Sequence, residues 1–314
     1  MDKHREEGWG FNQHSYQGNT NRYQGDSNHG DGNSGGILYL VATPIGNLGD
    51  ITQRAIDILK DVDVIAAEDT RQTNKLLQTF AISTPMVSYH EHNKYKKDEF
   101  LLQELLSGKR IALVSDAGLP GISDPGADIA QLAIYNQIPV VPIPGASAGV
   151  SSLIASGLDT ERFLFYGFLS RQSAKRKREL EEIKGLPFTL IFYEAPHRIE
   201  GTMKDMLAVL GNRQISVGRE LTKKFEQFIR GEIAYCLETL QQQKIQGEFT
   251  IVVSGASEEQ QLAMQSSQWW IDMTIAEHVD YYIGQGRDNK EAIKLTAKDR
   301  DCPKRDVYQA YHQI

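Results

Sequence analysis

The chain has 314 residues, of which 40% are hydrophobic, so it is long enough to form about two globular domains. Its formal net charge of -7 argues against a generic nucleic-acid binder, and any basic contact surface must therefore be local. The two cysteines, Cys236 and Cys302, have no CxxC or CxxH companion, so the sequence indicates neither a disulfide framework nor a zinc site and suits a reducing cytoplasm. No run approaches about 18 apolar residues and the N-terminus has no apolar signal core, so we expect neither membrane insertion nor export.

Residues 1–36 are rich in Gly, Asn, Gln and His and hold only scattered aromatic side chains. A segment of this composition cannot bury enough apolar surface to offset its ordering entropy, so we expect a disordered extension. His4, His14 and His29 follow no metal-ligand spacing, and we expect them to be solvated.

From Ile37 onward, short apolar runs alternate with helical patterns, which is typical of parallel sheets covered by helices. Over residues 37–157 the pattern predicts an α/β domain with a parallel five-stranded sheet. Its strands are expected at residues 37–42, 62–67, 85–89, 111–114 and 139–143.

A second series of apolar runs predicts another α/β domain over residues 158–256. Residues 215–229 leave no room for a helix between two strands, so part of this sheet should be antiparallel and the sheet mixed. Residues 257–267 are polar and are expected to form a linker. The remaining chain to residue 314 predicts helices only, near 274–283, 289–298 and 303–312.

The glycine-rich loop Ser115–Gly126 stands between a predicted strand and a predicted helix. Ligands of parallel sheets collect at the carboxyl ends of the strands, so this loop should line a binding cleft. Its glycines permit a close backbone approach and its prolines stiffen it. Ala127 and Asp128 stand where a phosphate-binding GxxxxGK[ST] loop needs Lys and Ser or Thr, which argues against an NTPase.

A G-x-S-x-G pattern centred on Ser147 matches the nucleophile elbow of α/β-hydrolases. Asp159 or Glu194, followed by His197, would complete the required order of acid and base. The small residues around Ser147 and the lack of an HGG-type oxyanion loop disfavour this interpretation. His90 and His92 suggest a metal pair, but no third ligand follows at the usual spacing, so we expect no metal.

Residues 170–178 carry five basic side chains at the start of a predicted helix. Such a cluster in an acidic chain is a candidate contact for RNA phosphates. A solvated helix face, neutralised by the glutamates that follow, is the open alternative. The C-terminal helices resemble a helix-turn-helix, but seven basic residues face five acidic ones between Gly286 and Tyr308. This balance is weak for a DNA reader and leaves an accessory RNA contact or a dimer element.

Seven blocks of the sequence carry a further signal when they are taken together and in order. The blocks are Tyr39–Thr52, Glu68–Arg71, Ser115–Gly126, Pro142–Ala148, Phe192–Arg198, Arg219–Lys223 and Gly247–Thr250. They resemble the ribosomal RNA small subunit methyltransferase I family of the tetrapyrrole-methylase-like superfamily. The resemblance covers about residues 37–255 and reaches the C-terminal helices more loosely.

The resemblance implies S-adenosylmethionine bound between the two α/β domains, and methylation of a cytidine ribose 2′-hydroxyl in the decoding region of small-subunit (16S) ribosomal RNA. It also implies a homodimer that acts on the small ribosomal subunit in the cytoplasm. By position, the implied cofactor contacts are Ile45, Asp116, Leu119, Pro120, Gly121, Ile122, Ser147, Ala148, Leu169, Ala195 and Thr250. The expected RNA contacts are Arg71, Lys175, Arg176, Lys177, Arg178, Arg198, Arg219 and Lys223.

A sulfonium methyl group is already activated, so the protein must mainly align the 2′-oxygen with it and exclude water. A general base helps because a ribose hydroxyl is a poor nucleophile. Asp69, His90, Glu194 and His197 are candidates, and Glu194 and His197 are favoured because their block is expected to face the cleft. Two other functions stay open: a small-molecule methyltransferase of the tetrapyrrole type, and a helix-turn-helix binding module on an inert scaffold.

Overall fold

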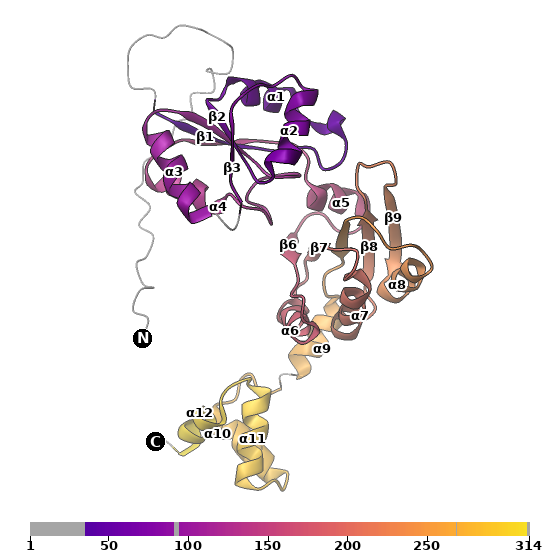
Figure 1. Ribbon diagram of the computed structural model, residues 1–314. Coiled ribbons are helices and arrows are strands. Elements are labelled where there is room, and N and C mark those ends of the chain that lie inside the picture. Colours follow the sequence, from indigo (N-terminus) through magenta and orange to yellow (C-terminus); the bar gives the residue numbers. More distant parts are fainter. Residues whose placement is uncertain (1–34, 91–93, 268, 313–314) are drawn as a thin grey trace. The chain divides into compact units, whose positions relative to one another are not determined.

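The computed structural model describes residues 35–90, 94–267 and 269–312, coloured along the chain in Figure 1. The expected disordered extension, residues 1–36, therefore lies outside the described residues except for its last two. Among the described residues, no helix is long and apolar enough to cross a membrane.

The first sheet has five strands in the order β3-β2-β4-β1-β5, and all neighbouring strands are parallel. This confirms the predicted parallel sheet. Both of its faces are covered, so its strands are apolar along most of their length instead of alternating with polar residues. The strands are β1 (Ile37–Val41), β2 (Val64–Ala67), β3 (Met86–Ser88), β4 (Arg110–Val114) and β5 (Val140–Ile143).

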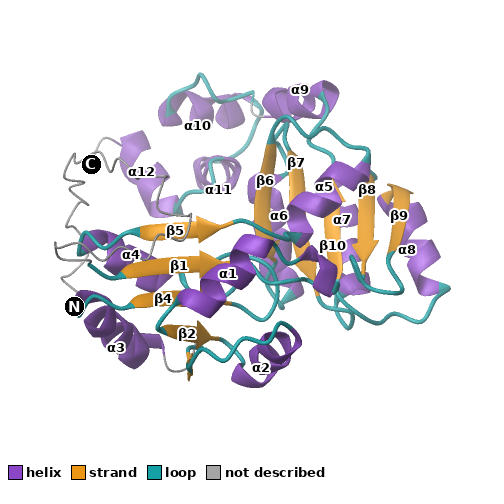
Figure 2. Cartoon of the chain, turned by 90° about the horizontal axis from the view of Figure 1, so that it is seen from above, coloured by secondary structure: helices purple, strands orange, loops and turns teal. Residues whose placement is uncertain are grey.

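Helices on the two faces of this sheet bury two separate apolar cores, because successive strand residues point to opposite faces. On one face, Val41 and Ile65 pack with Leu59 of α1 and Leu77 of α2. The other core consists of strand residues such as Leu38 and Ile111 with α3 and α4 (Figure 2). The helices are α1 (Gln53–Asp61), α2 (Thr70–Thr79), α3 (Lys94–Leu106) and α4 (Ala127–Tyr135), with a short 3-10 helix at Leu48–Asp50.

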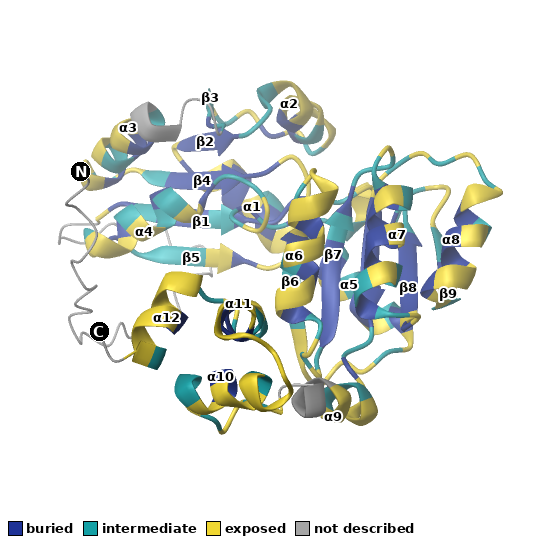
Figure 3. Cartoon of the chain, turned by 90° about the horizontal axis from the view of Figure 1, so that it is seen from below, coloured by how far each residue is buried: buried dark blue, intermediate teal, exposed yellow. Residues whose placement is uncertain are grey.

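The second sheet has the strand order β6-β7-β10-β8-β9. Only β6 and β7 are parallel, and the other neighbours are antiparallel, so the predicted mixed sheet is confirmed. Its central strands are buried, as Figure 3 shows. The strands are β6 (Phe163–Phe168), β7 (Thr189–Glu194), β8 (Gln214–Arg219), β9 (Gln227–Glu232) and β10 (Phe249–Val253).

The second sheet is covered on one face by α6 (Ser173–Ile183), α7 (Ile199–Leu210) and α8 (Ile233–Gln241), which share a large apolar core with it. The other face carries α5 (Ala148–Ser156), although this helix follows the last strand of the first sheet. Leu153 of α5 packs against the second sheet's buried Ile191 and Val252. Helix α5 therefore follows the first sheet in the sequence but packs against the second sheet.

The C-terminal part is helical, as predicted, but residues 258–267 form helix α9 instead of a linker. Ser257 accepts a hydrogen bond from Gln260 N at its start, and acidic residues in the first turn suit the positive end of a helix. The following helices bury a small core that includes Val279, Ile293 and Val307. They are α10 (Ile275–Gly284), α11 (Asn289–Asp299) and α12 (Lys304–His312).

Candidate functional site

A cavity of about 540 Å³ lies where strand ends of both sheets come together, and we call it the strand-end pocket. Loops after β1, β2, β4 and β5 supply one side of it, and the ends of β6 and β7, the loop after β8 and the start of β10 supply the other. Its size lies in the range of small-molecule sites. Its lining includes Ile45, Glu68, Asp116, Leu119, Ile122, Asp124, Ser147, Ala148, Phe168, Tyr193, Ala195, His197, Leu221, Glu248 and Thr250.

The glycine-rich loop after β4 is fixed to the loop after β1. Thr43 N donates to Gly118 O at 2.9 Å, and Gly118 N donates to Thr43 O at 3.1 Å. The Thr43 hydroxyl adds a bond to Ser115 O at 3.1 Å. At Gly126, where φ is 141°, a Cβ atom would lie 2.8 Å from Leu113, so only glycine fits. This bonding and packing hold the loop in one place beside the pocket.

Ser123 in the same loop has φ 63°, a left-handed conformation that costs free energy for a residue other than glycine. Strand β6 approaches it closely, since a Cβ on Gly167 would lie 3.2 Å from Ser123 Oγ. Gly167 follows an irregularity in the pairing of β6 with β7. Ser123 is thus held by its own loop and by strand β6. It directly precedes Asp124, which lines the pocket.

Besides Glu194, four carboxylates line the strand-end pocket, from Glu68, Asp116, Asp124 and Glu248. Asp116 Oδ1 accepts a hydrogen bond from Asp69 N at 3.0 Å, which connects the ends of β4 and β2. Burial raises the pKa of Glu68. Burial, followed by repulsion from the other three carboxylates, raises the pKa of Asp124 to about 7, although a hydrogen bond with Ser115 opposes this shift.

Sequence reasoning did not single out Asp124, although it lies in the loop that was expected to line the cleft. It also missed Tyr193, whose hydroxyl accepts a hydrogen bond from Gly149 N at 3.0 Å. The Tyr193 ring packs edge-on against Phe165 and Phe168, with centroids 5.0 and 5.7 Å away. Burial raises the pKa of Tyr193, so the phenol stays neutral at physiological pH.

Most of the residues expected to bind the cofactor are brought together around this pocket. Eight of them line it: Ile45, Asp116, Leu119, Ile122, Ser147, Ala148, Ala195 and Thr250. Pro120 and Gly121 lie in the same loop but not among the lining residues. The Leu169 side chain is buried in the core of the second sheet, which leaves only its backbone for a ligand contact.

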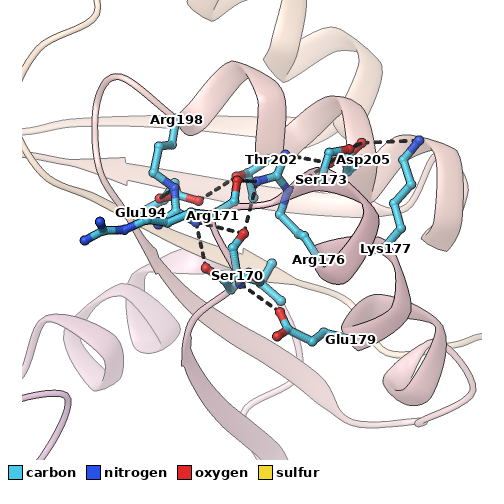
Figure 4. Close-up of polar contacts among 11 residues, drawn as sticks. Ser170, Arg171, Ser173, Arg176, Lys177, Glu179, Glu194, Arg198, Thr202 and Asp205 are labelled. Atoms are coloured by element: carbon cyan, nitrogen blue, oxygen red, sulfur yellow. Dashed lines mark hydrogen bonds and ion pairs between the residues drawn. The ribbon is translucent and has the colours of Figure 1, made fainter.

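The two favoured catalytic residues both line the pocket, but only one is exposed. Glu194 is 2% exposed, and its carboxylate accepts hydrogen bonds from Ala195 N at 2.8 Å and Thr202 Oγ1 at 2.5 Å. Arg198 Nε lies 3.1 Å from the same carboxylate (Figure 4). With both oxygens engaged, Glu194 anchors the end of β7. His197 is exposed at the rim.

Arg176, expected to contact RNA, is buried instead. Its Nη2 lies 2.6 Å from Asp205 Oδ2 of α7 and its Nε 2.8 Å from the same oxygen (Figure 4). Its Nη1 donates to the carbonyls of Ser170 and Arg171. Arg176 lies on the buried face of α6, whereas Lys175, Lys177 and Arg178 lie on its exposed face. A run of basic residues in the sequence does not show which of them will face inward. Arg176 therefore fixes α6 to α7, and this geometry gives it a structural role in place of a phosphate contact.

Other expected RNA contacts differ in how far they are neutralised. Arg198 is held by Glu194 and by the carbonyl of Leu169, at 2.6 Å. Lys223 pairs with two carboxylates, at 3.0 and 2.9 Å, and Lys177 lies 3.5 Å from Asp205.

The remaining expected contacts are more open. The Arg71 side chain is 87% exposed but pairs with Asp69 at 3.0 Å. Lys175 and Arg178 are exposed on α6, and within the part of the chain that the structure describes neither pairs with a carboxylate. Arg219 Nε donates to Gln246 O at 2.8 Å.

The other sequence motifs are placed as follows. Ser147 precedes the first turn of α5, and Asp159, one of the two candidate triad acids, accepts a hydrogen bond from Glu161 N. Of the two histidines considered for a metal, His92 lies outside the described residues. Over residues 35–90, 94–267 and 269–312, no group of three or more His, Cys, Asp or Glu side chains is arranged to hold a metal ion.

Comparisons with known proteins agree with this architecture. Two solved structures share the fold at low identity: a diphthine synthase (TM-score 0.54, 13% identity, 72% of this chain and 93% of that one) and a cobalt precorrin-4 methyltransferase (TM-score 0.50, 16% identity, 69% and 94%). Residues 37–235 match the Tetrapyrrole (Corrin/Porphyrin) Methylases family.

Relatives of high identity carry one shared name, Ribosomal RNA small subunit methyltransferase I. The protein of Bacillus subtilis is 55% identical over 277 residues, which cover 88% of this chain and 94% of the relative. The protein of Synechocystis is 44% identical over 275 residues, which cover 87% and 96%. The chain therefore belongs to the tetrapyrrole methylase family and, within it, to the ribosomal RNA small subunit methyltransferase I group.

Proposed function

We propose that this protein uses S-adenosylmethionine to methylate the 2′-hydroxyl of a cytidine ribose in the decoding region of small-subunit (16S) ribosomal RNA. The proposal is supported by the strand-end pocket, which holds a carboxylate of pKa about 7. It is also supported by the 55% identity of the chain to a named ribosomal RNA methyltransferase. The identity supports the class of acceptor, and the carboxylate supports transfer to a hydroxyl group.

The lining of the pocket fits the methyl donor. S-adenosylmethionine supplies a methyl group on a positively charged sulfur, which becomes a neutral thioether when the acceptor oxygen takes the methyl. The carboxylates of Asp116 and Glu68 suit the positive charges of the sulfur and the amino group. Ile45, Leu119 and Ile122 offer an apolar wall for the adenine ring. Ser147, Ala148, Ala195 and Thr250 complete the proposed contacts.

Asp124 is the proposed proton acceptor. A general base is most effective when its pKa lies near the working pH, and the pKa of Asp124 is about 7. As the acceptor oxygen bonds to the methyl carbon, its proton passes to a carboxylate oxygen of Asp124. His197, exposed at the rim, is the second candidate, whereas Glu194 holds three partners already. Tyr193 and Phe168 give this side of the pocket an aromatic wall.

The proposed RNA contacts are the exposed cations around the pocket and on α6. Lys175 and Arg178 have no carboxylate partner among the described residues, so they are available to phosphates. The other proposed RNA contacts are Arg71, Lys177, Arg219 and Lys223. Three of them, Arg71, Lys177 and Lys223, must first exchange a carboxylate partner for a phosphate. A homodimer, a cytoplasmic location and the small ribosomal subunit as partner are further parts of the proposal, supported by the family.

The decisive experiment supplies labelled S-adenosylmethionine with small ribosomal subunits, with protein-free 16S RNA and with a porphyrin-type acceptor. We expect label in RNA, at a nucleotide whose ribose resists alkaline cleavage after transfer. Label only in the small-molecule acceptor would establish the tetrapyrrole-type alternative instead. Binding of the subunit without any transfer would leave the binding-module alternative.

A further inference from the structure

A second surface on the β8–β9 side carries an aromatic ring among cations. Phe225 is 68% exposed, more than Phe168 at 53% and Phe163 at 45%. With Arg219, Lys224, Gln227 and Gln246 it lines an open cavity of about 470 Å³, to which Glu226 also contributes. We call these residues the Phe225 surface.

Neither cation of the Phe225 surface forms an ion pair with a carboxylate among the described residues, although Arg219 interacts electrostatically with Glu220. The Lys224 ammonium lies 5.5 Å from the centre of the Phe225 ring, and it pairs with no carboxylate over the described ranges. Arg219 donates its Nε to the carbonyl of Gln246, and its guanidinium lies 6.0 Å from the centre of the Phe249 ring; its terminal nitrogens donate to no described residue. The Glu226 carboxylate accepts a hydrogen bond from Thr222 N at 2.6 Å and is therefore tied to its own loop.

The loop is held in one conformation by its other residues. Glu220 and Thr222 have positive φ angles of 51° and 64°, which persist only where the surroundings enforce them. Lys223 pairs with Glu220 at 3.0 Å and with Glu248 at 2.9 Å. A Cβ on Gly247 would lie 2.4 Å from the Glu220 side chain, so the loop packs directly on the backbone before β10. Phe225 is thus presented on a pre-organised loop, which lowers the entropy cost of binding.

The Phe225 surface adjoins the strand-end pocket. Leu221 of the same loop lines that pocket, as does Glu248, two residues after Gln246. The loop also contacts the loop after β1, since a Cβ on Gly46 would lie 2.4 Å from Lys223 Cγ. An RNA strand whose reacting nucleotide enters the strand-end pocket would therefore bring a neighbouring nucleotide to the Phe225 surface.

We propose that the Phe225 surface binds an unpaired RNA nucleotide that flanks the methylated one, with its base stacked on Phe225 and its phosphate at Arg219 and Lys224. Single-stranded RNA is recognised by this combination of an aromatic face and a basic rim. Phe and Arg also occur often in protein interfaces, whereas Lys is depleted there, so a protein partner is the alternative outcome of the test. The inference rests on the proposed function and adds the site that positions its substrate.

The test compares Phe225→Ala and Phe225→Trp with the matched control Phe163→Ala, which removes a phenyl ring that is 45% exposed at the start of β6. We expect Phe225→Ala to weaken binding of small subunits by about tenfold, from the loss of one stacked base. Phe225→Trp and Phe163→Ala should bind within about twofold of the unmodified protein. Calorimetric affinity for S-adenosylmethionine and the thermal midpoint should be unchanged in all three, which excludes misfolding.

Salt dependence separates stacking from charge. Lys224→Ala should reduce the slope of log affinity against log salt by about 1, whereas Phe225→Ala should leave the slope unchanged. Unaltered subunit affinity in Phe225→Ala, while the unmodified protein still labels RNA, would overturn this inference alone and leave the exposed ring for a protein partner. No label in RNA from the unmodified protein would instead overturn the proposed function, and this inference with it.

Discussion

The proposed role of Asp124 predicts how the rate of methyl transfer depends on pH. With a pKa of about 7, roughly one-tenth of the Asp124 carboxyl groups are ionised at pH 6 and nine-tenths at pH 8. The single-turnover rate should therefore rise about tenfold per pH unit below pH 7 and level off above it. Asp124→Asn keeps the shape of the side chain but cannot accept the proton. We expect its rate to fall by about 100-fold or more and to lose this pH dependence.

The groups that face Asp124 give a second, finer test. Glu68, Asp116 and Glu248 repel its negative charge, Ser115 donates a hydrogen bond, and the Tyr193 phenol is neutral. Glu68→Gln removes one repulsive charge, so the midpoint of the pH profile should move to lower pH while the plateau rate is less affected. Single-turnover transfer of labelled methyl groups to small subunits, from pH 5.5 to pH 9, measures both variants.

Cofactor affinity and stability complete this prediction. Because the native pKa of Asp124 exceeds the value of about 3.9 expected in the unfolded chain, the native state binds the proton more tightly. Ionisation of Asp124 therefore lowers the free energy of unfolding progressively as pH rises from about 4 to about 7. Asp124→Asn should melt at a higher temperature than the unmodified protein at pH 8 and show a smaller difference near pH 4. An Asp124→Asn protein that binds S-adenosylmethionine normally and retains the rate and its pH profile would refute the proton-acceptor role.

Three further predictions concern the basic cluster and the N-terminal segment. Arg176→Ala removes the buried partner of Asp205, which keeps Ser173 and the partly exposed Lys177, and should lower the free energy of unfolding by about 1.5–3 kcal/mol, measured by urea denaturation. Lys175→Ala combined with Arg178→Ala should leave that free energy within about 0.5 kcal/mol but weaken subunit binding and reduce its salt dependence; unchanged binding would remove α6 from the RNA contacts. Removal of residues 1–35 should leave methyl transfer intact, because the family match begins at residue 37, and a truncated protein without activity would contradict this.

The architecture was predictable because its signal is local. Buried parallel strands appear as short apolar runs, and each of the five runs between residues 37 and 143 contains or overlaps a strand of the first sheet. The antiparallel part of the second sheet followed from the short distance between β8 and β9. Helix α9 was missed because its residues are mostly polar and carry no apolar repeat, so composition indicated a linker.

The electrostatic features of the site were not predictable in the same way. The pKa of Asp124 is raised by burial and then by Glu68 and Glu248, which are distant in sequence and meet it only in the folded chain. Likewise, the partner that buries Arg176 is Asp205 on another helix. Motif matching found the loops that form the pocket, but the state of each charged group is a property of the tertiary structure.

Helix α5 has a consequence for how the chain divides into fragments. The predicted boundary between residues 157 and 158 separates α5 from the sheet on which Leu153 packs. A fragment that ends there would carry an apolar helix face with no surface to cover, and a fragment that begins at 158 would leave Ile191 and Val252 open to solvent. We expect soluble halves only when the cut lies between β5 and α5, near Gly145, so that the helix travels with the second half. Exchange of halves between related methyltransferases should succeed at the same junction.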